Sequence, residues 1–198
     1  DVHVLANGET FYAQEMDAIR SAQKSVNLEA YIFQEGEVTR RFVAALIERA
    51  KAGVKVNMVI DAVGSVGTSA RYFDALREAG GRVERYHPFG WDTVARFNNR
   101  THRVLLVIDG CVGFVGGAGF ADLWFCDTPE SPRWRDTMVR VEGDAVQSLQ
   151  AAFTENWLES SGEILSGQEY FPPPNGDRQK PLSADRSSVE MVVSSSPS

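Results

Sequence analysis

The chain has 198 residues, of which 43% are hydrophobic and 24% are charged, and this length and composition are ordinary for one globular domain with a sizeable core. Acidic residues outnumber basic ones by 27 to 20, and the net charge of −7 argues against a general nucleic-acid binder. Cys111 and Cys126 make no disulfide framework, and no apolar run approaches the roughly 20 residues of a membrane span.

Strand-like and helix-like segments alternate through the first 88 residues. Apolar spacing predicts strands at 2–6, 25–33, 54–61 and 82–88. Helices are predicted between them, over 9–23, from Val38 to a C-capping Gly53, and over 72–79. This order predicts an α/β fold, with a mixed, mostly parallel sheet flanked by helices on both faces.

The pattern changes after residue 100. Two apolar strands, 102–109 and 111–117, are joined at Gly110, and a further strand at 138–143 precedes a helix over 146–157. From Gly162 onward, Pro, Gly, Ser and charged residues dominate, so we expect a domain over 1–165 and a linker over 166–188. Residues 189–198 begin another strand pattern, which is either the start of a second unit or a disordered tail.

A histidine stands at the mouth of the strand predicted over 102–109. Because side chains alternate along a strand, one face is expected to carry His102, Val104, Leu106 and Ile108, and the other Arg103, Leu105, Val107 and Asp109. Asp109 is therefore expected to be a structural anion and not a partner of His102. A histidine beside the Gly116–Gly117 backbone can attack a phosphodiester, although a lone strand histidine and a glycine pair are more often structural.

This stretch resembles the HxKxxxxD signature of the phospholipase D superfamily, followed by its GG or GS element. His102 and Asp109 match the signature, and Gly116–Gly117 match the glycine element. The segments LEAYIF, RAKAGVKVNMVIDAVGS and WRDTMVRVEG are similar to bacterial cardiolipin synthase-type proteins, and the similarity covers nearly the whole chain in order. The resemblance implies the first of two similar halves, with a second motif beyond residue 198.

The resemblance also implies a mechanism. In the family, the histidine of one half attacks phosphorus and that of the other protonates the leaving alcohol, so His102 is the nucleophile or the acid. Water or a lipid hydroxyl then resolves a phosphohistidine. Asp136 occupies the place of the carboxylate that holds the imidazole, although a surface charge is the alternative. Gly116 and Gly117 are the expected phosphate-binding backbone, and no metal or cofactor is expected.

Three positions depart from the family pattern. Val104 replaces the lysine that would bind a phosphate oxygen, a loss worth a few kcal/mol by order of magnitude. Gly119 stands where many members have asparagine, and Met138 stands where a histidine is expected. Among the nearby arginines, Arg100 shares the parity of His102, whereas Arg103 is expected to point away.

These features leave three functional hypotheses. The first is half of a phosphatidyltransferase or phospholipase. The second is a pseudoenzyme or interaction module, because Val104 replaces the lysine that would bind the phosphate. The third is a nuclease, which the excess of acidic residues disfavours. The expected partners are a phospholipid substrate, a second half or a homodimer mate, and the membrane surface, without nucleic acid. We expect a location at the bacterial cytoplasmic membrane, peripheral or anchored upstream of Asp1, and an isolated chain that is inactive.

Overall fold

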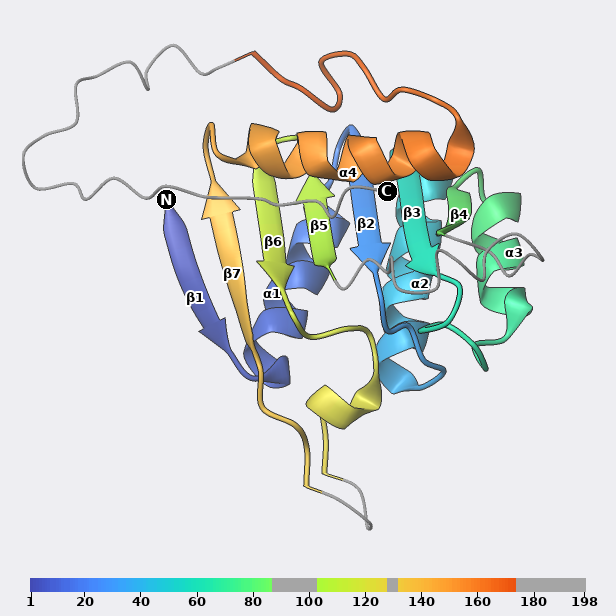
Figure 1. Ribbon diagram of the computed structural model, residues 1–198, viewed down its shortest axis with the longest axis vertical. Helices are drawn as coiled ribbons and strands as arrows, with labels where there is room; N and C mark the ends of the chain where they lie inside the picture. Colours follow the sequence, from blue (N-terminus) through green and yellow to red (C-terminus); the bar gives the residue numbers. More distant parts are fainter. Residues whose placement is uncertain (87–102, 128–131, 174–198) are drawn as a thin grey trace, which may run out of the picture.

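The computed structural model describes residues 1–86, 103–127 and 132–173. Its middle layer is a seven-stranded sheet in the order β1-β7-β6-β5-β2-β3-β4 (Figure 1). The strands are β1 (Val2–Ala6), β2 (Ser25–Ala30), β3 (Lys55–Asp61), β4 (Arg82–Tyr86), β5 (Val104–Ile108), β6 (Val112–Gly116) and β7 (Thr137–Glu142).

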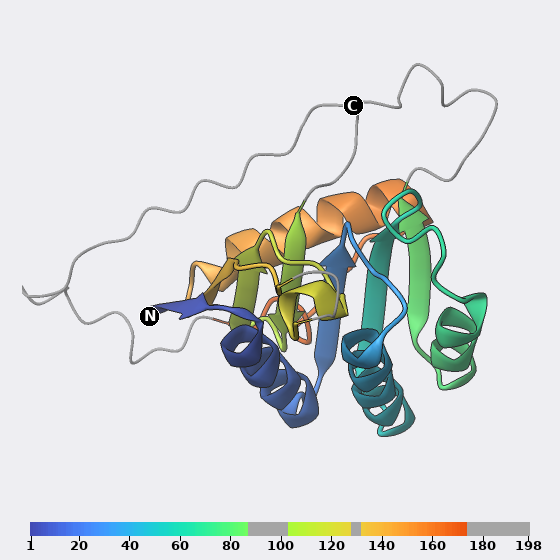
Figure 2. The ribbon, with the colours of Figure 1, turned by 90° about the horizontal axis from the view of Figure 1, so that it is seen from below.

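Helices cover both faces of the sheet, as the sequence predicts. The helices are α1 (Gly8–Ser21), α2 (Glu37–Lys51), α3 (Ala70–Glu78) and α4 (Val146–Ser161), with a short 3-10 turn, η2 (Asp122–Trp124). Figure 2 shows α1, α2 and α3 side by side beneath the sheet and α4 alone on the opposite face. Helix α4 contacts β2, β3, β4, β5 and β6, so it crosses most of the sheet.

The sheet is mixed, and its parallel part is confined to one side. Strands β2, β3 and β4 pair in parallel, as expected for the βαβ units of the first half. The remaining pairings, β2–β5, β5–β6, β6–β7 and β7–β1, are antiparallel. The expectation of a mostly parallel sheet therefore holds only for the β2-β3-β4 side, because the hairpin at Gly110 and the strand after residue 136 reverse direction.

Side-chain alternation divides the core into two layers. Val104, Leu106 and Ile108 belong to the cluster packed under α1–α3. Leu105 and Val107 belong to the smaller cluster under α4. The alternation predicted for residues 104–108 is thus confirmed, and the residues of β5 are buried on both faces.

One strand end differs from the sequence prediction. Strand β2 ends at Ala30 instead of residue 33, because the chain leaves the sheet and Phe33 forms an isolated bridge with Phe120. Residues after 165 pack back onto the fold: Tyr170 is buried, and the backbone oxygen of Glu169 accepts a hydrogen bond from Ser25 at 2.6 Å. Within the described residues, no helix is both long and apolar enough to cross a membrane.

Candidate functional site

The described residues of the predicted site, apart from Asp109, meet at one edge of the sheet. Strands β1, β2 and β6 end at this edge, and β5 and β7 begin there (lower edge in Figure 1). Val104 pairs with Gly116, Gly116 pairs with Met138, and Met138 pairs with Leu5. We call this row of four paired residues the edge row.

Apolar side chains fill the edge row. Val104 and Met138 are 1% and 0% exposed, and both belong to the core under α1–α3. A Cβ added to Gly116 would collide with Sδ of Met138 and come within 2.8 Å of the carbonyl oxygen of Thr137. Gly116 is therefore required by close packing, and the space next to Val104 holds a thioether where a phosphate site needs a cation.

The carboxylate of Asp136 lies beside the next glycine. A Cβ placed on Gly117 would be 3.4 Å from Oδ2 and 3.6 Å from Oδ1 of Asp136. Oδ1 also accepts the backbone N–H of Thr137 at 2.7 Å, and the backbone oxygen of Asp136 accepts the N–H of Asn7 at 2.9 Å. The structure thus brings Asp136 and Gly117 together, with the half-buried carboxylate held just before β7 begins.

The chain after Gly117 is held by the segment that follows β2. A Cβ on Gly119 would lie 2.5 Å from the carbonyl oxygen of Ile32, which accepts the N–H of Phe120 at 2.8 Å. The hydroxyl of Tyr12 donates to the carbonyl oxygen of Gly119 at 2.5 Å. Because Tyr12 is buried, desolvation raises its pKa and keeps this donor protonated. The backbone leaves no room for the asparagine side chain of many family members at position 119.

Asp109 lies at the other end of β5 and has a local structural role. Its Oδ1 accepts the backbone N–H groups of Lys24 and Ser25 at 2.7 and 2.8 Å, and its Oδ2 accepts that of Gln23 at 2.9 Å. The residue itself has a φ of +53° in the turn that leads to β6. Asp109 therefore ties this turn to the start of β2 and is separated from Val104 by the length of β5.

A buried polar cluster under α4 was not anticipated from the sequence. Nε of Arg103 lies 3.5 Å from Oε1 of Glu29, which also accepts a hydrogen bond from Asn156 at 2.7 Å. Glu29 is 0% exposed, and Nη1 of Arg103 is buried without a hydrogen-bond partner among the described residues. The only sequence signal was a glutamate inside the apolar strand pattern of LEAYIF.

The same cluster extends to the end of β4. The hydroxyl of Tyr86 donates to Oε2 of Glu159 at 2.8 Å. Desolvation is the main cause that raises the pKa of Tyr86, and this hydrogen bond is the second. Tyr86 and Arg103 are the residues on either side of 87–102. His102, the predicted catalytic histidine, lies in that segment and so outside the described residues, as does Arg100. No group of three metal-binding side chains occurs in the part of the chain that the structure describes.

The described part of the edge can orient a group through Asp136 and can present the backbone of Gly116 and Gly117. It does not offer a cation at position 104. A nucleophilic imidazole held by a carboxylate and supported by a glycine-rich backbone is an arrangement suited to attack on phosphorus. In this chain, only His102 is placed by sequence to supply the imidazole.

Comparison with known families identifies the source of this pattern. Residues 16–157 match the family described as cardiolipin synthase, PLD-like domain. The cardiolipin synthase of Geobacillus thermodenitrificans is 38% identical over 172 residues, which cover 86% of this chain and 34% of that protein. The major cardiolipin synthase ClsA of Bacillus subtilis is 35% identical over 161 residues, covering 81% of this chain and 33% of that protein. The chain thus spans about a third of the length of these relatives.

Solved structures share the fold. Nuc, a phospholipase D family member from Salmonella typhimurium, has a TM-score of 0.64 at 18% identity, and the match covers 84% of this chain and 99% of Nuc. Phosphatidylserine synthase of Haemophilus influenzae has a TM-score of 0.59 at 15% identity, with 80% of this chain and 36% of that protein covered. At these identities the similarity concerns the fold alone.

Proposed function

We propose that this chain, which belongs to the cardiolipin synthase, PLD-like domain family, supplies one half of a site for phosphatidyl transfer between phospholipids. The observation that carries the proposal is the position of the Asp136 carboxylate beside Gly117, at the edge where β5 begins. In the sequence, His102 lies two positions before Val104, the first residue of β5. A second half, covalently joined or a homodimer mate, would supply the other histidine.

In this proposal, one histidine forms a phosphohistidine while the head alcohol leaves with a proton from the other histidine. Water or a lipid hydroxyl then attacks phosphorus, and the histidine leaves. Asp136 would fix the tautomer of His102 and stabilise its imidazolium. Its carboxylate is suited to this role because one oxygen is already anchored to the N–H of Thr137, which limits its rotation.

The experiment is a substrate panel on a protein that joins this chain to a second PLD-like half, at a membrane surface. Release or exchange of the head alcohol of a labelled phospholipid is expected, with an oligonucleotide left intact. The Asp136→Asn variant is expected to retain lipid binding and lose turnover. Oligonucleotide cleavage without lipid turnover would replace this proposal with that of a nuclease.

A second candidate function has its own supporting observation. Val104 is buried against the core, and Met138 occupies the space over Gly116, so this half could serve as a catalytically impaired partner of an intact second half. A lysine at 104 would face the Met138 thioether, so the informative variant is Val104→Lys combined with Met138→His. A rise in phosphatidyl transfer would support an impaired site in this half. A rate unchanged from that of the parent would show that the absence of a phosphate-binding lysine at position 104 does not limit phosphatidyl transfer.

A further inference from the structure

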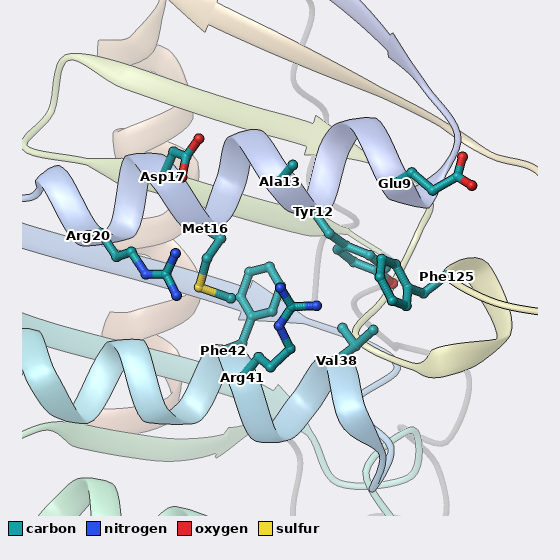
Figure 3. A pocket seen from close by; sticks show the side chains of 10 residues that line it. All are labelled: Glu9, Tyr12, Ala13, Met16, Asp17, Arg20, Val38, Arg41, Phe42 and Phe125. Atoms are coloured by element: carbon teal, nitrogen blue, oxygen red, sulfur yellow. The ribbon is translucent and has the colours of Figure 1, made fainter.

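A groove runs between α1 and α2. It has a volume of about 370 Å³ and is closed at one end by Phe125, which follows η2 (Figure 3). This volume is at the lower end of the range of roughly 300 to 1,000 Å³ that is usual for sites that bind small molecules. The proposed transfer reaction makes no use of this groove.

The floor of the groove is apolar and aromatic. Tyr12 and Met16 of α1 and Phe42 of α2 are each 5% exposed or less. The rings of Tyr12 and Phe42 pack edge to face, with centroids 5.6 Å apart, and Tyr12 also lies 6.3 Å from the ring of Phe125. The exposed side of this floor is suited to an alkyl chain, and the flexible Met16 thioether can adapt to it.

Two arginines stand over this floor from opposite sides. Figure 3 shows Arg20 of α1 and Arg41 of α2 extending toward the space above Met16 and Phe42. Among the described residues, neither guanidinium forms an ion pair, and that of Arg41 lies over the ring of Phe125, 5.8 Å from its centroid.

The carboxylates near the groove do not neutralise these two arginines. Glu9 is paired with Arg133. Asp17 of α1 also lines the groove, but among the described residues it forms no ion pair with Arg20 or Arg41. The groove therefore combines an apolar floor with two cations that have no carboxylate partner in the described part of the chain.

We propose that this groove binds a single-chain phosphate amphiphile, with the alkyl chain along Tyr12, Met16 and Phe42 and the phosphate between Arg20 and Arg41. An uncharged chain would leave both guanidiniums without a partner, and a free anion would leave the apolar floor in water. Phosphate is the matching head group because it presents oxygens on several sides, so each of two guanidiniums can form a two-point contact. The site goes beyond the proposed transfer reaction and does not depend on it.

The test is calorimetric titration of the 198-residue chain with dodecyl phosphate, kept below its micelle-forming concentration. Saturable binding with one site per chain is expected, and Arg20→Gln and Arg41→Gln are each expected to weaken it about tenfold, as for the loss of a charged hydrogen-bonded contact. Arg40→Gln is the matched control, because Arg40 neighbours Arg41 but pairs with Glu37 and does not line the groove. Both groove arginines are exposed, so these variants are expected to keep the parent melting temperature.

Two further ligands and one variant separate the parts of the proposal. Dodecanol and inorganic phosphate are each expected to bind at least tenfold more weakly than dodecyl phosphate, because each has only half of the complementary chemistry. Ala13 is exposed at the groove wall, so Ala13→Phe is expected to block the chain without disturbing the core. The proposal is overturned if the Arg20→Gln, Arg41→Gln or Ala13→Phe variant binds dodecyl phosphate as tightly as the parent chain does. It is also overturned if the parent chain binds dodecanol as tightly as dodecyl phosphate.

Discussion

Glu15 tests the packing of α1 against the sheet, because it is a carboxyl group buried without a partner. It is 1% exposed, and among the described residues neither of its carboxyl oxygens accepts a hydrogen bond. Desolvation raises the pKa of Glu15 from 4.5 to about 8. Glu15 is therefore protonated in the folded protein at pH 7 and ionised in the unfolded chain.

The effect on stability follows from the two pKa values. Because the folded pKa is above the unfolded value, the cost to folding is absent below pH 4.5, grows with pH between 4.5 and about 8, and is constant above that. One pKa unit corresponds to about 1.4 kcal/mol, which gives a cost of about 3 kcal/mol at pH 7. Glu15→Gln removes the titration and keeps the size of the side chain. We expect this variant to gain stability over the parent by an amount that increases from pH 4.5 to pH 8.

The assay is urea unfolding of both proteins at several pH values, followed by tryptophan fluorescence. Asp17→Asn is the control, since Asp17 is an acidic residue exposed on the same helix. The reasoning is refuted if the difference between Glu15→Gln and the parent does not change with pH, because a carboxyl group that reaches water or a partner has no such dependence.

Three other substitutions test the fold around the candidate site. Gly116→Ala is expected to lower stability by about 1 to 3 kcal/mol, since its Cβ meets Met138 and the backbone of Thr137, and an unchanged melting temperature would contradict the close packing of β6 and β7. Asp109→Ala is expected to lower the free energy of unfolding by about 2 kcal/mol, measured by chemical denaturation. Asp109→Asn is expected to lose less, because its amide oxygen can still accept a backbone N–H and its amide nitrogen cannot. Equal losses in the two variants would argue against the three hydrogen bonds. Glu29→Gln is expected to lower the free energy of unfolding by about 3 kcal/mol, because it leaves Arg103 unpaired. The loss is expected to be smaller when Glu29→Gln is combined with Arg103→Gln. Losses that simply add in the double variant would show that the two side chains do not interact.

Much of the fold was predictable, because each strand and helix carries its own periodic pattern. The alternation along residues 104–108 correctly divided β5 between the two core layers, and Gly53, predicted to end the second helix, has a φ of +87°. The direction of each strand was harder to predict from the sequence, since the antiparallel pairings depend on contacts between segments that are distant in the sequence. The end of β2 was missed for the same reason, because Phe33 bridges to Phe120.

The candidate site was predictable only where a motif carried it. Gly117 and Asp136 are 19 positions apart in the sequence; the family pattern named each of them as a site residue, and the structure shows that they lie in contact. The cluster of Glu29, Arg103 and Asn156 lies outside the motif. Its members come from three segments that are distant in the sequence, so no local pattern predicted the cluster. The groove between α1 and α2 likewise arises from the packing of two helices.

The most direct test of the proposed role is the rate of phosphatidyl transfer by a His102→Ala variant of a protein that joins this chain to a second PLD-like half. We expect a loss of about a thousandfold or more, because removal of a nucleophile or general acid eliminates a whole step. His3→Ala, at an exposed position in β1, is the matched control and is expected to keep the parent rate. A His102→Ala variant that transfers phosphatidyl groups within tenfold of the parent rate would contradict the claim that this chain supplies half of the site.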